Sequence, residues 1–138
     1  MKIINCIVCD DIRHEVGNKV TLVGLYDDKI KIQTPEPLKL KWPLHMRLSL
    51  FARLKFEKNE TFPSRFEYQI LNNDQKILSV PGDIKIADAE NPIALSFVSN
   101  VAIQTPGKLI FRVEFTKDQK NILEKLETNI DVIVEKIG

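Results

Sequence analysis

The chain has 138 residues, 43% hydrophobic and 28% charged, with a formal net charge of +1 at pH 7. Its length is typical of one domain, and its near-zero charge offers no field to attract a polyanion or an acidic membrane. No stretch approaches the roughly 18 apolar residues of a membrane span, and the start lacks a signal peptide's apolar run. We therefore expect one cytoplasmic domain over residues 1–138, without membrane contact and with nucleic-acid binding disfavoured.

The opening run, Ile3–Cys9, is apolar at nearly every position and rich in β-branched residues. This composition predicts a central strand covered on both faces. Cys6 and Cys9 form a C-x-x-C pattern, which can signal redox or metal chemistry. On a strand, however, residues three apart lie about 10 Å apart and point to opposite faces, beyond the roughly 7 Å between Cα atoms that a disulfide tolerates. We interpret both cysteines as reduced structural residues of the core and expect no cofactor.

A hairpin follows, with its turn near Gly17 and Asn18. A two-residue loop would place charged side chains opposite apolar ones, for example Arg13 opposite Leu22, which a half-buried sheet disfavours. A three-residue loop over residues 16–18 instead sorts polar with polar residues, and Asn tolerates the left-handed conformation that such loops need. The preferred pairs of this odd-length loop are Glu15 with Lys19, Arg13 with Thr21, and Ile12 with Leu22.

The remaining chain alternates between apolar and polar residues in segments separated by Gly, Pro and Asn-Asp turns. Strands are expected at Lys29–Gln33, Leu44–Glu57, Arg65–Ile70, Gln75–Val80, Ile93–Ile103, Leu109–Phe115 and Ile130–Val134. Residues 34–43 read as an extended surface connection, 81–83 as a turn, and 84–92 as irregular or edge-like. Residues 117–127 allow either a short helical turn or a strand. This pattern predicts an all-β, two-sheet antiparallel sandwich, immunoglobulin-like in architecture, with at most one short helix.

The residues most suggestive of a site are Asp10, Asp11, Arg13 and His14. The two carboxylates interrupt the apolar strand pattern and lie near an imidazole, so a metal-dependent enzyme or a metal-binding domain is one hypothesis. Aspartate is also common at turns and strand breaks, and the spacing matches no calcium loop. No nucleophile motif accompanies His14. We therefore treat these four as candidate binding residues and assign neither a catalytic nor a metal role.

A basic stripe lies on one face of the strand expected at 44–57, and it includes one aromatic residue. Its members are His45, Arg47, Phe51, Arg53 and Lys55. Such a face can stack single-stranded nucleic acid. It can equally be a solvated face whose charges pair with neighbouring carboxylates, with Phe51 covered by a loop. The absence of a net basic charge favours the second interpretation.

One motif allows a family comparison: Cys9-Asp10-Asp11-x-Arg13-x-Glu15-x-Gly17-x-Lys19-x-x-Leu22-x-Gly24-x-Tyr26. It resembles the N-terminal signature of a family of small bacterial proteins described only as a domain of unknown function. A weaker likeness extends to the proline-rich connection and to Pro106–Arg112. The resemblance implies a bacterial, single-domain β-sandwich, and it carries no activity, ligand or catalytic residue.

Together these observations predict a non-catalytic interaction module. The expected partner is another protein or a second copy of the chain, paired through a strand edge. Gly24, within the second arm of the hairpin, is expected to mark a bulge or a close backbone approach.

Overall fold

The computed structural model describes residues 1–87, 91–118 and 121–138. Their regular structure is almost entirely β, interrupted by a single 3-10 turn at Pro37–Lys39 (η1). The strands are β1 (Lys2–Glu15), β2 (Lys19–Tyr26), β3 (Lys29–Thr34), β4 (Leu44–Lys55), β5 (Arg65–Asn72), β6 (Gln75–Asp83), β7 (Ile93–Ile103), β8 (Gly107–Lys117) and β9 (Asn121–Lys136). No helix in these ranges is long and apolar enough to cross a membrane.

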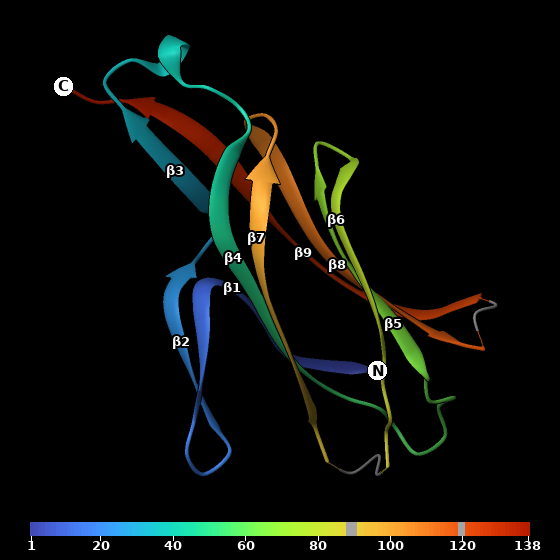
Figure 1. Ribbon diagram of the computed structural model, residues 1–138. Coiled ribbons are helices and arrows are strands. Elements are labelled where there is room, and N and C mark those ends of the chain that lie inside the picture. Colours follow the sequence, from blue (N-terminus) through green and yellow to red (C-terminus); the bar gives the residue numbers. More distant parts are fainter. Residues whose placement is uncertain (88–90, 119–120) are drawn as a thin grey trace.

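The strands form two sheets that pack as a sandwich (Figure 1). Sheet A has the order β2-β1-β4-β7, and sheet B has the order β3-β9-β8-β5-β6. Sheet A is antiparallel, as expected, but the prediction of antiparallel pairing throughout is wrong for sheet B, where β3 and β9 run parallel from Lys29 beside Asp131 to Thr34 beside Lys136. After Tyr26 the chain leaves sheet A and enters sheet B as β3, beside β9. Hydrophobic alternation does not indicate whether two neighbouring strands run parallel or antiparallel.

The core lies between the sheets and is built by the alternation seen in the sequence. On β4, the apolar side chains at every second position from Leu48 to Leu54 are fully buried, and Phe56 continues the row. Sheet B contributes large side chains from β5 and β8, and the ring of Tyr68 stacks on that of Phe97 at 4.2 Å. Burying one such side chain contributes about 1.5–3 kcal/mol relative to leaving it in water.

Three local expectations are wrong. The opening run is not covered along its whole length, since Ile3 and Ile4 are exposed and β2 pairs with β1 only from Val8 onward. Residues 81–83 continue β6 rather than forming a turn, since Pro81 pairs with Glu67 and Asp83 with Arg65. β6 is an edge strand, where a proline can sit with its missing N–H facing away from the ladder. The helical alternative for 117–127 also fails, because β9 begins at Asn121 and runs as one strand through Lys136. Residues 84–87 and 91–92 are irregular, as expected, while 88–90 and 119–120 lie outside the described residues.

At one end of the sandwich, two turns are joined by asparagine side chains, and we call this contact the clasp. Asn72 accepts hydrogen bonds from the backbone N–H groups of Gln104 and Thr105 at 2.8 and 3.1 Å. Asn73 accepts one from Lys108 at 2.9 Å and donates one to the carbonyl of Pro106 at 2.9 Å. The clasp therefore fastens the β5–β6 turn of sheet B to the connection that arrives from sheet A.

The two long sides of the sandwich differ. On one side, the edge strands β6 and β7 contact each other. On the other, β2 pairs only with the second half of β1, starting at Val8, and β3 pairs only with the last part of β9, starting at Asp131. Within the described chain, Lys2–Ile7 of β1 and residues 121–130 of β9 therefore have no strand on their outer side. We call the first of these the open edge.

Candidate functional site

The β1–β2 hairpin has the register expected from the sequence. Glu15 lies opposite Lys19, and the pairing continues through Ile12 opposite Leu22, so the three-residue turn is confirmed. Gly17 and Asn18 have φ values of +85° and +57°, the left-handed conformation that such a turn requires. Figure 1 shows this hairpin projecting from the sandwich as a two-stranded arm.

The arm begins at Asp10 and Asp11, where the sequence suggested an interruption. The strand continues there without a break, but its side-chain alternation does not. Cys9 and Ile12 are three residues apart, yet both belong to one buried cluster with Phe51. Pairing of β1 with β4 ends at Cys9, opposite Ser49. We call these two aspartates the elbow. At the elbow, the side chains of β1 exchange the faces of the sheet to which they point, and β1 separates from β4.

Gly24 is the residue of β2 that lies beside the elbow. Its φ is +66°, and a Cβ atom placed on it would lie 2.3 Å from Oδ2 of Asp10. Any other L-residue would be strained by this backbone and would collide with the carboxylate. The flip of the strand faces at the elbow therefore depends on a glycine in the neighbouring strand.

Several polar groups of the elbow form hydrogen bonds within the described part of the chain. The Tyr26 hydroxyl donates a hydrogen bond to Oδ1 of Asp10 at 2.5 Å, and Arg47 donates to Oδ1 of Asp11 at 2.8 Å. The backbone carbonyl of Asp10 accepts from the Ser49 hydroxyl at 3.2 Å, and that of Asp11 from the Cys9 thiol at 3.4 Å. The last two bonds supply donors to backbone carbonyls just beyond the point where pairing of β1 with β4 ends.

Protonation at the elbow follows from these contacts. The hydrogen bond from Arg47 lowers the pKa of Asp11, with the backbone N–H of Ile12 adding to the effect. Burial and the hydrogen bond to Asp10 raise the pKa of Tyr26 to about 12. At neutral pH the Asp11 carboxylate is charged and already paired, which is a structural arrangement rather than an open ligand set.

Arg13 and His14 lie further along the arm and are exposed, opposite Thr21 and Val20. His14 is not gathered with the two aspartates: no group of three or more His, Cys, Asp or Glu side chains in the described ranges could hold a metal ion. The four candidate binding residues are thus divided between the elbow and the exposed arm.

The two cysteines point to opposite faces of β1, as expected, and both are free thiols. Cys6 faces the core between the sheets, and burial raises its pKa to about 11. Cys9 is fully buried on the outer face of sheet A, and burial also raises its pKa. Both thiols are therefore protonated, and poorly nucleophilic, at neutral pH.

Phe51 is buried in the same outer-face cluster, packed with Cys9, Ile12 and the partly buried Leu22. The expectation that a loop covers it is wrong, since side chains of the hairpin cover it instead. The ring is therefore not available to stack a base. Because Arg47 is paired with Asp11, the basic stripe also loses one of its charges to the elbow.

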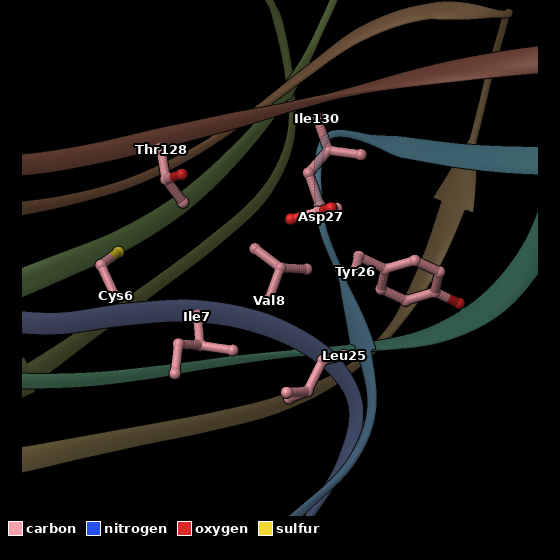
Figure 2. A pocket seen from close by; sticks show the side chains of 8 residues that line it. All are labelled: Cys6, Ile7, Val8, Leu25, Tyr26, Asp27, Thr128 and Ile130. Atoms are coloured by element: carbon pink, nitrogen blue, oxygen red, sulfur yellow. The ribbon is translucent and has the colours of Figure 1, made fainter.

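A pocket of about 420 Å³ lies where the open edge meets the end of β2, and we call it the notch (Figure 2). Its lining residues come from β1, β2, β9 and the turn after β2: Cys6, Ile7, Val8, Leu25, Tyr26, Asp27, Thr128 and Ile130. In Figure 2, the side chains of β1 and β9 lie on opposite sides of the notch. The notch thus opens the space between the sheets at the side where both lack an outer strand.

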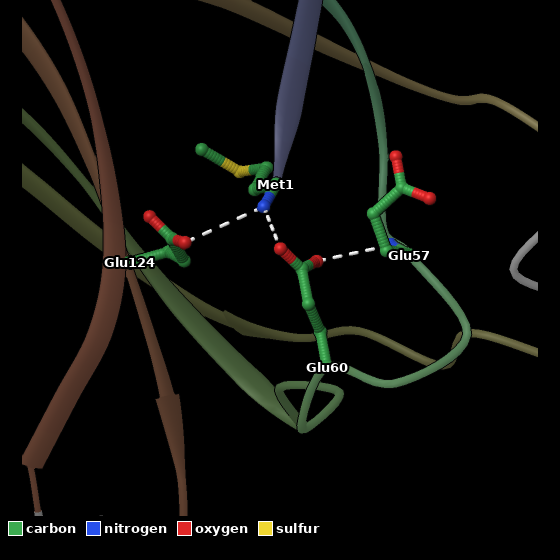
Figure 3. A network of polar contacts seen from close by, with 4 residues as sticks. All are labelled: Met1, Glu57, Glu60 and Glu124. Atoms are coloured by element: carbon green, nitrogen blue, oxygen red, sulfur yellow. Dashed lines mark hydrogen bonds and ion pairs between the residues drawn. The ribbon is translucent and has the colours of Figure 1, made fainter.

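The other end of the open edge is fixed by the chain's amino group (Figure 3). The Met1 ammonium is paired with Glu60 of the loop after β4 and lies 3.4 Å from Oε1 of Glu124 on β9. These carboxylates raise the pKa of the ammonium, and the pairing lowers that of Glu60. A smaller pocket of about 230 Å³, lined in part by Phe56 and Leu123, lies beside this contact.

The notch and the open edge were not singled out in the sequence, although one signal could have found them. The hairpin register places Tyr26 opposite Val8, and Asp27-Asp28 then turns the chain away. Every residue before Val8 is thereby left without a partner on that side. Counting residues outward from the turn along β1 and β2 would have shown that β1 is longer than its partner.

Comparison with protein-family models gives no match for this chain, and comparison with curated proteins gives none either. The family resemblance of the Cys9–Tyr26 motif therefore stays a prediction.

Proposed function

We propose that this protein is a non-catalytic binding module of the bacterial cytoplasm, which takes up an extended segment of a partner protein at the open edge of β1. The observation that carries this proposal is the unpaired run Lys2–Ile7 beside the notch. At the usual rise of a strand, this run is about 20 Å long. An unpaired strand edge presents backbone N–H and C=O groups that an added strand can satisfy.

Side chains along the open edge support the same proposal. Ile3, Ile4 and Leu25 are 45%, 38% and 62% exposed. Leu123, across the gap on β9, is 39% exposed. An added strand would cover part of this apolar surface and the mouth of the notch, and removing apolar surface from water contributes roughly 25 cal/mol per Å².

The chemistry of the nearby polar groups also favours binding over catalysis. The thiols are protonated at neutral pH because burial raises their pKa values, and the Asp11 carboxylate is held by Arg47. A nucleophile needs a base within hydrogen-bond reach, and neither Cys6 nor Cys9 has a base among its hydrogen-bond partners in the described chain.

A peptide-display experiment tests this function. Immobilised protein is exposed to a library of random seven-residue peptides, and we expect enrichment of extended, apolar-rich sequences. Binding of the enriched peptides should slow hydrogen exchange at the amides of Lys2–Ile7. An Ile4→Lys variant should lose them, because a charge at the edge opposes strand addition.

Val98→Lys is the matched control, since Val98 is 42% exposed but lies on β7, at the opposite side of sheet A. That variant should retain the peptides. A library that shows no enrichment on monomeric protein, or peptides that bind Ile4→Lys as well as the original protein, would contradict the function.

A further inference from the structure

The open edge is complementary to itself. We propose that its occupant is a second copy of this chain, whose β1 adds antiparallel to the first β1 around a two-fold axis. This inference rests on the proposed function, because it assumes that the open edge accepts a strand, and it names that strand. Four properties of the edge support it: length, side-chain chemistry, charge and the path of the neighbouring strand.

The length of the unpaired run and the position of β2 suit a second copy of β1. The vacancy spans Lys2–Ile7, because β2 covers β1 only from Val8 onward. In an antiparallel, two-fold pairing, the Lys2–Ile7 run of each copy fills the vacancy of the other. Each β2 then continues in line with the β1 of the other copy. An isologous contact of this kind closes on itself and yields a dimer rather than a fibre.

The side chains of the run suit the space that it would enter. A strand in this position needs apolar groups on both faces, because the notch lies towards the core and the exposed Leu25 lies beside its outer side. Lys2–Ile7 itself carries isoleucine at three of its six positions and shows no alternation with charged residues. A strand with one polar face would leave one of these apolar surfaces uncovered.

Charges at the two ends of the run are also complementary. In the antiparallel arrangement, Lys2 of one copy lies beside Ile7 and Val8 of the other. Val8 pairs with Tyr26, so Lys2 reaches the exposed Asp27 that follows. Neither Lys2 nor Asp27 forms an ion pair or a side-chain hydrogen bond within the described part of one chain. The two-fold axis would create this Lys2–Asp27 pair twice.

Two features of β1 oppose edge pairing. The register with β4 shifts between Ile3 and Asn5, and such irregularities commonly protect edges. Lys2, a charge at the start of the run, is a second such protection, whereas proline is absent from Lys2–Ile7. The protection is therefore partial, which fits a dimer that forms at micromolar concentration rather than an obligate one.

Sedimentation equilibrium tests the dimer. The wild-type chain should be dimeric at micromolar concentration, Ile4→Lys should be monomeric and still folded by circular dichroism, and Val98→Lys should remain dimeric. Reversing the charges gives a readout that a purely structural role would not produce. Lys2→Glu and Asp27→Lys should each weaken dimerisation several-fold, and the double variant should recover most of the loss.

A wild-type protein that stays monomeric at high micromolar concentration would overturn the inference, as would a dimer that survives Ile4→Lys or charge variants that show no recovery when combined. The peptide library separates this failure from that of the proposed function. A monomer whose open edge captures library peptides would retain the binding function with a foreign partner, whereas a monomer that captures none would lose both.

Discussion

The elbow and the clasp share one local arrangement, but it separates two strands at the elbow and joins two turns at the clasp. At each, a glycine with positive φ lies against the side chain of an Asp or Asn: a Cβ atom on Gly24 would be 2.3 Å from Asp10, and one on Gly107 would be 2.3 Å from Asn73. In both places a close approach between neighbouring segments therefore requires glycine.

The partners of these side chains differ. At the clasp, neutral amides bond backbone groups and hold two turns together. At the elbow, carboxylates bond the side chains of Tyr26 and Arg47, and the hairpin separates from the sheet. Amides that bond the backbone therefore close the sandwich independently of ionisation, whereas the elbow relies on charged groups that pH and salt can alter. The following predictions test that difference.

The largest expected effect comes from Gly24→Val. The left-handed backbone and the collision with Asp10 should together cost about 3 kcal/mol of unfolding free energy, measured by urea denaturation. Gly17→Val provides the control, because Gly17 also has positive φ but meets only the end of the Lys19 side chain, at 3.7 Å. Equal costs for both variants would show that the contact with Asp10 adds nothing.

Asn72→Ala should come next. The substitution leaves the N–H groups of Gln104 and Thr105 without their acceptor in a part-buried site, at a cost of about 2 kcal/mol. The loss should be the same from pH 4 to pH 8, since no group in these bonds titrates there. Asn129→Ala, at an exposed position of β9, should leave stability unchanged. A strongly pH-dependent loss would contradict the assignment of the clasp as neutral.

Asp11→Asn should loosen the arm with a smaller effect on overall stability. The folded-state pKa of Asp11 is lowered by Arg47, so its contribution is complete above the ordinary value of about 3.9 and is lost as pH falls through the lowered pKa. Hydrogen exchange in β2 should rise in the wild type over that acidic range, and in Asp11→Asn already at pH 7.

Asp74→Asn, in the exposed β5–β6 turn, is the matched control and should leave exchange in β2 unchanged. Added salt should speed exchange in the wild-type arm while leaving the clasp amides unaffected. An arm that responds to neither acid nor salt would contradict the electrostatic account of the elbow.

The smallest effect concerns the Met1 ammonium. Its pKa is raised by the contact with Glu60, so the contact stabilises fully below about pH 8 and is lost as pH rises through the raised pKa. Because the partner carboxylates are partly exposed, the contribution should stay below about 1 kcal/mol. Acetylating the amine should lower the melting temperature slightly at pH 7 and remove this alkaline dependence.

Sequence patterns predicted the fold well where one sheet face is wet and the other is buried. The alternation along β4 and the sorted faces of the hairpin each allow only one register, and both were correct. The parallel pairing of β3 with β9 was not predictable, because a six-residue strand reads the same in either direction. The range expected for β6 ended too early, at Val80, because Pro81 and Gly82 are typical of a turn, although an edge strand tolerates both.

For the site, the sequence drew attention to Asp10 and Asp11 but could not name their partners. Arg47 and Tyr26 reach them across strands, and such contacts follow from register rather than from a motif. The reversal of faces between Cys9 and Ile12 was also hidden, because a glycine on another strand makes it possible. The open edge was not predicted, although the hairpin register, which places Tyr26 opposite Val8, contained the information needed to find it.

The parallel pair also sets the order in which the molecule can assemble. Lys29 finds its partner at Asp131, about 100 residues later in the chain, and β9 supplies the neighbour of both β3 and β8. During synthesis, the edges of β3 and β8 that pair with β9 stay without a partner until β9 has been made. Contacts this distant in sequence slow folding and prolong the exposure of unpaired strand edges to aggregation, so the formation of β9 determines when these edges are covered.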